Sequence, residues 1–245
     1  YDQPETAKNW LKNYLIKNLE SGQYQINYPF DTKFFESIER IEIIACGTSK
    51  HAAMVGKFLL EQFSGIPTNV FYASEFRYSP PPLLPNTLTI GVTQSGETAD
   101  TIAAIDMEIK RRSSKEDKKF TPNLIAITNR KESSIGRQVL NIIDICAGIE
   151  VGVAATKTFF GQLLSFYGLA IKFAQIKGTQ SSDEIDKLIT ELIKLPPLIE
   201  DLLEQHNESS EKLAHDFFNI KDVIFLGRGI NCLLYTSDAA DEIAS

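Results

Sequence analysis

The sequence predicts an α/β fold in which a doubly wound, five-stranded parallel sheet lies between layers of helices. Three observations support this prediction. The strand-like segments are short and largely apolar, as in sheets that are covered on both faces. Helical segments separate them, which favours parallel pairing through crossover connections. The length of 245 residues and the apolar fraction of 43% are those of an ordinary globular chain.

The expected elements follow one another with short connections. Strands are expected, as apolar runs, at 41–45, 69–72, 87–92, 123–127 and 142–145. Helices are expected at about 51–63, 98–110 and 155–176, then at 183–194, 197–204 and 210–219, with a further strand beginning at 223–226. The charged run 111–119, RRSSKEDKK, is expected to be a solvated loop.

Composition and charge exclude several classes of protein. The formal net charge is −7, whereas nucleic-acid surfaces need clustered lysine and arginine. The apolar runs are too short to cross a bilayer, and the first ten residues lack the basic start and apolar core of a signal peptide. The cysteines Cys46, Cys146 and Cys232 are too far apart for a disulfide framework or a metal cluster. We therefore expect a reduced, cytoplasmic protein that binds neither nucleic acid nor membrane.

Both ends of the chain are unusual. The first residue is Tyr1 and not methionine, so we expect the sequence to begin inside a longer protein. Residues 232–242 resemble a translated sequencing-library adapter of the transposon-end type, and a genuine C-terminal helix is the alternative. An ordinary coding continuation in the nucleotide sequence would contradict the adapter origin. Residues 232–245 are therefore left out of the fold prediction.

Two hydroxyl-rich turns follow strands of the predicted sheet. One is Cys46-Gly47-Thr48-Ser49, after the first strand, and the other is Thr93-Gln94-Ser95-Gly96-Glu97-Thr98, after the third. Open parallel sheets bind ligands outside the carboxyl ends of their strands, at the point where the strand order reverses. Both turns therefore have the position of a ligand site.

The second turn has the chemistry of an anion site. Gly96 permits a positive φ, and Thr98 is expected to cap a helix whose first turn offers unpaired N–H groups and the positive end of the dipole. The hydroxyls of Thr93, Ser95 and Thr98 and the Gln94 amide add neutral donors. The turn lacks the lysine of the GxxxxGK[ST] loop that holds a triphosphate with magnesium, so it suits a single phosphate group. A capped helix without a ligand is the alternative.

Five stretches place the sequence in a family. They are "IACGTS", "ASEFRY", "QSGETADT", "GVAATKTF" and "FLGRG", in this order. Together they resemble the isomerase half of the glucosamine-6-phosphate synthase family, and the opening "YDQPET" resembles the segment after that family's glutaminase domain. The resemblance runs from Tyr1 to about Asn231, whereas QSGETADT alone indicates only the wider phosphosugar-binding (sugar isomerase, SIS) domain. It implies a three-layer SIS fold of the flavodoxin-like or Rossmann-like type.

The resemblance also implies which residues bind the ligand. It places the phosphate loop on Thr93, Gln94, Ser95 and Thr98. It places the sugar-contacting turn on Cys46, Gly47, Thr48 and Ser49, with backbone contacts to the open-chain sugar near Val153 and Ala155.

Three positions depart from the family pattern. The family usually has serine where this chain has Thr93, which keeps a hydroxyl and adds a methyl group. It often has serine where Ala155 stands, so one side-chain oxygen is lost but no backbone group. Lys50 replaces a commoner aromatic residue.

The domain organisation that the resemblance implies leaves this chain without its catalytic residues. Residues 1–31 would follow a missing glutaminase domain, 32–180 would form the first SIS subdomain, 181–231 would hold linking helices and the first strand of a truncated second subdomain, and 232–245 would be a non-native tail. The family converts fructose 6-phosphate and glutamine to glucosamine 6-phosphate and glutamate, and its acid–base residues lie in the second subdomain.

The expected activity of this chain is therefore binding. Isomerisation with amination at carbon 2 needs a positioned general base, and the chain offers no candidate. We expect it to bind fructose 6-phosphate or glucosamine 6-phosphate weakly, without catalysis and without a metal or organic cofactor. Because isomerase domains pair in this family, the resemblance also implies a homodimer.

The remaining polar residues each have a structural interpretation beside a functional one. Glu97 is expected to be a first-turn acid favoured by the helix dipole and not a base. His51 either touches ligand or a neighbouring subunit, or lies on a helix surface, whereas His206 and His215 are expected to be solvated. Cys46 is expected to behave as a small buried hydrophobe.

Two basic residues are also open to more than one interpretation. Lys157 either approaches the anion or has a capping or structural role. Arg77 either stabilises a contact between subunits or subdomains, or pairs with Glu75.

Two other functions need features that the sequence does not show. A non-catalytic sugar-phosphate sensor needs an attached regulatory or DNA-binding module. A dinucleotide-binding oxidoreductase needs GxGxxG after the first strand, and neither Ala45-Cys46-Gly47-Thr48-Ser49-Lys50 nor the lone GRG at Gly227 supplies it.

Overall fold

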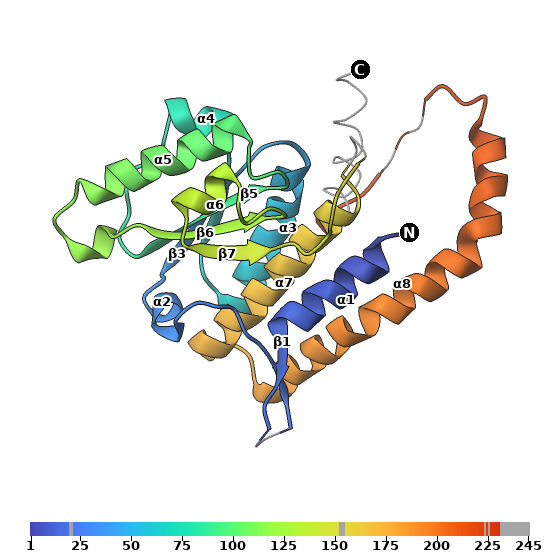
Figure 1. Ribbon diagram of the computed structural model, residues 1–245, viewed down its shortest axis with the longest axis horizontal. Helices are drawn as coiled ribbons and strands as arrows, with labels where there is room; N and C mark the ends of the chain where they lie inside the picture. Colours follow the sequence, from blue (N-terminus) through green and yellow to red (C-terminus); the bar gives the residue numbers. More distant parts are fainter. Residues whose placement is uncertain (20–21, 152–154, 223, 225, 231–245) are drawn as a thin grey trace.

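A five-stranded parallel sheet forms the centre of the computed structural model, which describes residues 1–19, 22–151, 155–222, 224 and 226–230 (Figure 1). Its strands are β3 (Arg40–Ala45), β4 (Thr68–Tyr72), β5 (Thr87–Thr93), β6 (Asn123–Thr128) and β7 (Asn141–Asp144). Their spatial order is β4-β3-β5-β6-β7, and every neighbouring pair is parallel. This is the strand order of a doubly wound, flavodoxin-like sheet, so the predicted fold class is confirmed.

Helices cover both faces of this sheet (Figure 1). On one face lie α4 (Ala73–Tyr78), α5 (Ala99–Ser113) and α6 (Ser134–Gln138), and on the other lie α3 (Gly47–Ser64) and α7 (Lys157–Lys177). Side chains alternate between the faces along a strand, and accordingly Ile43 joins the larger core under α3 and α7 while Ile44 joins the smaller core under α4 and α5. All seven residues of β5 are buried, as expected for a strand covered on both sides.

The first 36 residues contribute elements that the sequence does not predict. They are α1 (Gln3–Tyr14), the antiparallel hairpin of β1 (Leu15–Lys17) and β2 (Tyr24–Ile26), and α2 (Thr32–Glu36). Trp10 of α1 is fully buried, and its indole Nε1 donates to Ser165 Oγ of α7 at 3.3 Å. A Cβ on Gly168 would lie 2.7 Å from the Trp10 ring, so the missing side chain lets α1 pack closely on α7.

The prediction of three separate helices after residue 182 is wrong. The structure has one helix, α8 (Ser182–Phe217), which contains Pro196 and Pro197 and changes direction along its length (Figure 1). Proline removes a backbone donor and usually ends or kinks a helix, but here Pro196 is buried and α1 packs along α8. An ion pair of 2.5 Å between Lys8 and Glu200 joins the two helices beyond the prolines. Tertiary packing therefore overrides the local signal.

Two further predictions concern the carboxyl-terminal part of the chain. The strand predicted at 223–226 cannot be placed, because residues 223 and 225 lie outside the described residues. In the part of the chain that the structure describes, no helix is both long enough and apolar enough to span a bilayer.

The prediction that 111–119 is a solvated loop is wrong at its start. Helix α5 continues to Ser113, and the Arg112 side chain is fully buried. Its Nε donates to Glu108 Oε1 at 2.7 Å, and its Nη2 lies 4.0 Å from Glu42 Oε2 on β3. The run therefore contributes to a buried charge cluster, which Arg111 extends by pairing with Glu108 at 2.9 Å.

Because of this cluster, we expect the free energy of unfolding to depend on pH. Burial, together with a smaller effect of nearby Glu108 and against the opposing effect of Arg112, raises the pKa of the Glu42 carboxyl to about 7. Because the folded pKa exceeds the ordinary value, this contribution to stability is fully present below about pH 4.5 and is lost as pH rises through 7. We expect the Glu42 contribution to fall by up to about 3 kcal/mol between pH 5 and pH 8. Urea unfolding at both pH values measures it.

Glu42→Gln is expected to flatten this dependence, because the variant side chain does not ionise. Glu36→Gln, at an exposed position on α2, is the matched control and should keep the original dependence. A Glu42→Gln profile as steep as that of the unmodified chain would show that the dependence comes from other groups.

Candidate functional site

The two hydroxyl-rich turns meet at one edge of the sheet. Strands β3 and β5 are neighbours, and Ala45, the last residue of β3, pairs in register with Val92. The chain passes from β3 to β4 on one side and then crosses to β5 on the other. The edge beyond β3 and β5 is therefore the switch point of the sheet, where such folds bind ligands. The structure brings the turn after Ala45 and the turn after Thr93 together there.

The second turn is held by its own hydroxyl groups. Gly96 has a φ of 70°, as its predicted role requires. The hydroxyls of Thr93 and Thr98 share a hydrogen bond of 2.7 Å, and Thr93 Oγ1 also accepts from Gly96 N at 3.3 Å. Ser95 Oγ accepts from Glu97 N at 3.1 Å. Three of the four predicted phosphate-loop side chains thus shape the turn from within.

Thr98 has the predicted position but not the predicted hydrogen bond. It is the residue before the first turn of α5, yet its side chain does not cap that helix. Its hydroxyl contacts Thr93 instead, because Thr98 lies within reach of the end of β5. The first-turn N–H groups of α5 therefore receive no side-chain cap from Thr98. They lie at the positive end of the helix dipole, which favours an anion.

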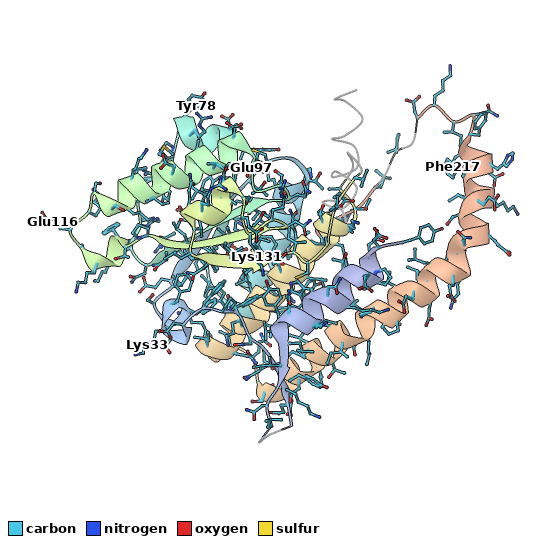
Figure 2. All side chains as sticks on the ribbon, in the orientation of Figure 1. Lys33, Tyr78, Glu97, Glu116, Lys131 and Phe217 are labelled. Carbon is cyan, nitrogen blue, oxygen red and sulfur yellow. The ribbon has the colours of Figure 1, made fainter. Side chains whose placement is uncertain are left out.

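The prediction that Glu97 serves the dipole of α5 is also corrected. Glu97 precedes α5, and its carboxylate accepts from Ser134 N at 2.9 Å, at the start of α6. Figure 2 labels Glu97 at the beginning of α5, beside α6. Hydrogen bonding from Ser134 lowers the pKa of the Glu97 carboxyl. A carboxylate held ionised in this way stabilises the start of α6 and is a weak base.

The segment after β6 supports the turn, and sequence reasoning did not find it. Asn129 N donates to Gln94 O at 3.1 Å, and Ile135 N donates to Gly96 O at 3.1 Å. A Cβ on Gly96 would lie 1.9 Å from Ser133 Oγ. The available signal was the TNRKESS stretch, whose polar residues follow the neighbouring strand.

The first turn proves to be the start of a helix. Cys46 is the residue before α3, and Gly47, Thr48 and Ser49 form its first turn, although the sequence predicts this helix only from about residue 51. Gly47 has a φ of 53°. Two helices, α3 and α5, therefore begin at the same edge, and their N-terminal dipoles add there.

Contacts from other elements fix this helix start. Ser49 Oγ accepts a hydrogen bond of 2.8 Å from Gln162 Nε2 on α7. The Lys50 Nζ lies 3.4 Å from the centroid of the Tyr72 ring, at the end of β4. The cation that replaces the commoner aromatic residue is thus held against a neighbouring ring, where cation–π attraction stabilises it.

The segment before α7 is only partly described. Val153, one of the predicted sugar-contacting residues, lies outside the described residues, and half-buried Ala155 stands just before α7. Glu150 was not predicted, yet its Oε2 accepts from Thr158 N at 3.0 Å and from Thr158 Oγ1 at 2.9 Å. Glu150 therefore fastens the chain to the start of α7.

The two basic residues with open interpretations have structural partners. Lys157 Nζ pairs with Asp2 Oδ2 at 2.7 Å, and Arg77 Nη1 pairs with Asp100 Oδ1 at 2.6 Å and not with Glu75. These contacts tie α7 to the N-terminal segment and α4 to α5.

The other candidate residues differ in exposure. Cys46 and His51 are half-buried, whereas His206 and His215 are exposed, as predicted.

The fold and this site define a class of phosphosugar-binding proteins. The model of the SIS domain matches residues 34–172, and the chain belongs to the SIS domain family. A curated relative, the glutamine–fructose-6-phosphate aminotransferase (isomerizing) of Thermosynechococcus vestitus, is 51% identical over 235 residues, which cover 94% of this chain and 37% of the relative. The enzyme of the same name from Synechocystis sp. is 49% identical over 235 residues, with the same coverage.

A solved structure agrees with these relatives. The C-terminal domain of glucosamine-fructose-6-phosphate aminotransferase from Francisella tularensis has a TM-score of 0.86 and 29% identity, and the match covers 98% of this chain and 64% of that one. The resemblance indicated by the five sequence stretches is therefore confirmed. The chain spans 37% of the length of the two curated relatives.

Proposed function

We propose that this chain forms the first phosphosugar-binding part of a glutamine–fructose-6-phosphate aminotransferase. The whole protein converts fructose 6-phosphate and glutamine to glucosamine 6-phosphate and glutamate, a step of amino-sugar synthesis. The observation that carries the proposal is the meeting of the turns after β3 and β5 at the switch point of the sheet. The names of the relatives favour this function over that of a regulatory sugar-phosphate sensor.

The proposed site divides its residues between the two ends of the ligand. Thr93, Gln94, Ser95 and Thr98 hold the phosphate at the start of α5. Cys46, Gly47, Thr48 and Ser49 contact the sugar, together with the backbone near Val153 and Ala155. Neutral donors and two helix dipoles suit a phosphate that must be released after each turnover.

The proposal assigns no catalytic residue to this chain. Moving a proton between carbons 1 and 2 of the sugar requires a positioned base, and Glu97 is held ionised by Ser134. The base belongs instead to a second SIS subdomain, and the nitrogen comes from a glutaminase domain. Residues 32–180 form the first subdomain in this proposal, and 181–231 lead into the second. The whole protein acts as a homodimer without a metal or organic cofactor, and sedimentation of the whole protein tests that state.

Glucosamine 6-phosphate is expected to bind the chain in a phosphate-dependent manner, and a Ser95→Ala, Thr98→Ala double variant is expected to lose this binding. Hydrogen bonds to charged groups contribute about 1.5–3 kcal/mol each, so the affinity should fall by at least about tenfold. Calorimetric titration of the full chain with glucosamine 6-phosphate measures it, with unphosphorylated glucosamine as the ligand control.

A double variant in the segment beyond the carboxyl end of α5 provides the protein control. The hydroxyls of Ser114 and Thr121 donate to nearby backbone carbonyls, so Ser114→Ala, Thr121→Ala should bind normally. Equal heats for glucosamine and its phosphate would contradict the proposed function. So would a folded Ser95→Ala, Thr98→Ala variant that binds as tightly as the unmodified chain.

A further inference from the structure

A buried glutamine on α7 contacts the sugar-side turn. Gln162 is 1% exposed, and its Nε2 donates to Ser49 Oγ at 2.8 Å. Its Oε1 is buried and has no hydrogen-bond partner among the described residues. Among the described residues, the bond to Ser49 is therefore the only hydrogen bond that the Gln162 side chain makes.

The position of Gln162 is costly for an amide. The side chain extends from α7 toward α3, and Phe166, one turn further along α7, is fully buried. Burying an amide with an unpaired oxygen costs roughly 1–3 kcal/mol relative to its exposure to water. A leucine of similar size would pack there without that cost. Packing alone therefore does not explain a glutamine at this position, whereas a hydrogen bond to Ser49 does, because it requires a polar side chain.

The register of the two helices brings these side chains together. A Cβ on Gly56 of α3 would lie 2.4 Å from the Phe166 ring, so α3 and α7 approach closely at that point. Ser49 lies toward the start of α3 from Gly56, and Gln162 lies one turn before Phe166 on α7. The close approach holds the amide against the first turn of α3.

The hydrogen bond determines what the Ser49 hydroxyl can do. A hydroxyl has one proton to donate and two lone pairs to accept with. Gln162 Nε2 can only donate, so it occupies one lone pair of Ser49 Oγ and cannot receive the Ser49 proton. We infer that Gln162 is a positioning residue that directs the Ser49 hydroxyl proton toward an oxygen of the bound sugar phosphate. This inference rests on the proposed function and assigns a residue that the sequence motifs do not include.

A double-mutant cycle tests the coupling. Glucosamine 6-phosphate binding is followed by phosphorus NMR titration of the full chain and of Gln162→Leu, Ser49→Ala and the double variant. A neutral hydrogen bond contributes on the order of 1 kcal/mol, so each single variant should bind about five- to tenfold more weakly. The double variant should bind about as weakly as either single variant, because both remove the same interaction.

Gln162→Glu provides a readout that a merely structural role would not give. An ionised carboxylate accepts the Ser49 proton and turns it away from the ligand, whereas the protonated acid donates as the amide does. The ratio of its dissociation constant to that of the unmodified chain should therefore be near one at pH 5 and rise severalfold by pH 8. This variant keeps the shape of glutamine and remains informative if Gln162→Leu does not fold.

Ser165→Ala is the matched control. Ser165 is a fully buried hydroxyl on the same helix that hydrogen-bonds to Trp10 and Gly161, so its loss should lower stability without changing affinity.

The outcomes separate this inference from the proposed function. Absence of binding by the unmodified chain would overturn the proposed function. Binding by the unmodified chain together with additive losses in the cycle, or with a Gln162→Glu ratio that does not change with pH, would overturn the role of Gln162 alone. Unaltered affinity in Ser49→Ala would overturn that role together with the proposed sugar contact of Ser49.

Discussion

Replacing Gly96 by alanine is expected to abolish phosphosugar binding and to destabilise the fold. The residue has a φ of 70°, where a side chain costs about 1–2 kcal/mol. The added Cβ would also lie 1.9 Å from Ser133 Oγ and 2.3 Å from Ser133 Cβ, so the segment after β6 would have to move. That segment supports the proposed phosphate loop through hydrogen bonds to Gln94 O and Gly96 O. We therefore expect a binding loss of at least about a hundredfold, since a shift of one ångström in a preorganised site removes most of its hydrogen bonds.

Gly65→Ala separates backbone strain from overlap. Gly65 ends α3 with a φ of 68°, and a Cβ there would meet nothing within 4 Å. It should lower the free energy of unfolding by about 1 kcal/mol and leave binding unchanged. Calorimetric titration and urea unfolding of both variants measure the difference. If Gly96→Ala binds as well as Gly65→Ala, the loop is not the anion site.

Gly56→Ala is expected to produce a large loss of stability in the core. The added Cβ would lie 2.4 Å from both Cγ and Cδ1 of Phe166 and 2.7 Å from Cε1. The ring is fully buried and has no solvent-facing direction in which to move, so α3 and α7 would have to separate. Overpacking of this kind costs about 1–3 kcal/mol and sometimes more. Urea unfolding measures it, and the midpoint should fall with little change in slope.

A compensating change tests the cause of that loss. Phe166→Leu shortens the side chain opposite Gly56, so it should recover part of the stability when combined with Gly56→Ala. Gly178→Ala, at a position open to solvent beyond α7, should show only the cost of its positive φ. A Gly56→Ala variant as stable as the unmodified chain would mean that the two helices do not depend on this close approach.

The sheet could be predicted from sequence because its strands are short apolar runs whose order follows from alternation with helices. β3, β5 and β6 each lie within one or two residues of the expected bounds. Elements stabilised by packing were harder to predict. α1 depends on burial of Trp10 against α7, and α8 continues through Pro196 because it packs on α1. Arg112 belongs to a charged run for which the sequence predicts a solvated loop, yet Glu108 and Glu42 are its partners in the interior.

The candidate site was predictable where its residues are adjacent in the chain. The loop from Thr93 to Thr98 contains its own donors and its own glycine, and local geometry accounts for its conformation. The partners of that loop were not predictable, because Ser133 and Ser134 reach it from the start of α6, in the segment that follows the neighbouring strand β6. Gln162 was missed for the same reason: nothing in its own stretch of sequence marks it, and the role that we infer for it depends on its hydrogen bond to Ser49 on another helix.

The hydrogen bond between Ser49 and Gln162 joins positions 113 residues apart in the chain. Bringing two such positions together costs chain entropy of about (3/2)RT ln n, on the order of 4 kcal/mol before any contact forms. Helix α5, by contrast, packs on α4, which precedes it closely in the chain. The phosphate side of the proposed site is thus assembled by a short stretch of chain. The sugar side, with Ser49 and Gln162, requires most of the domain to be in place. Any ligand that binds across both halves contributes its binding energy to holding that long loop closed.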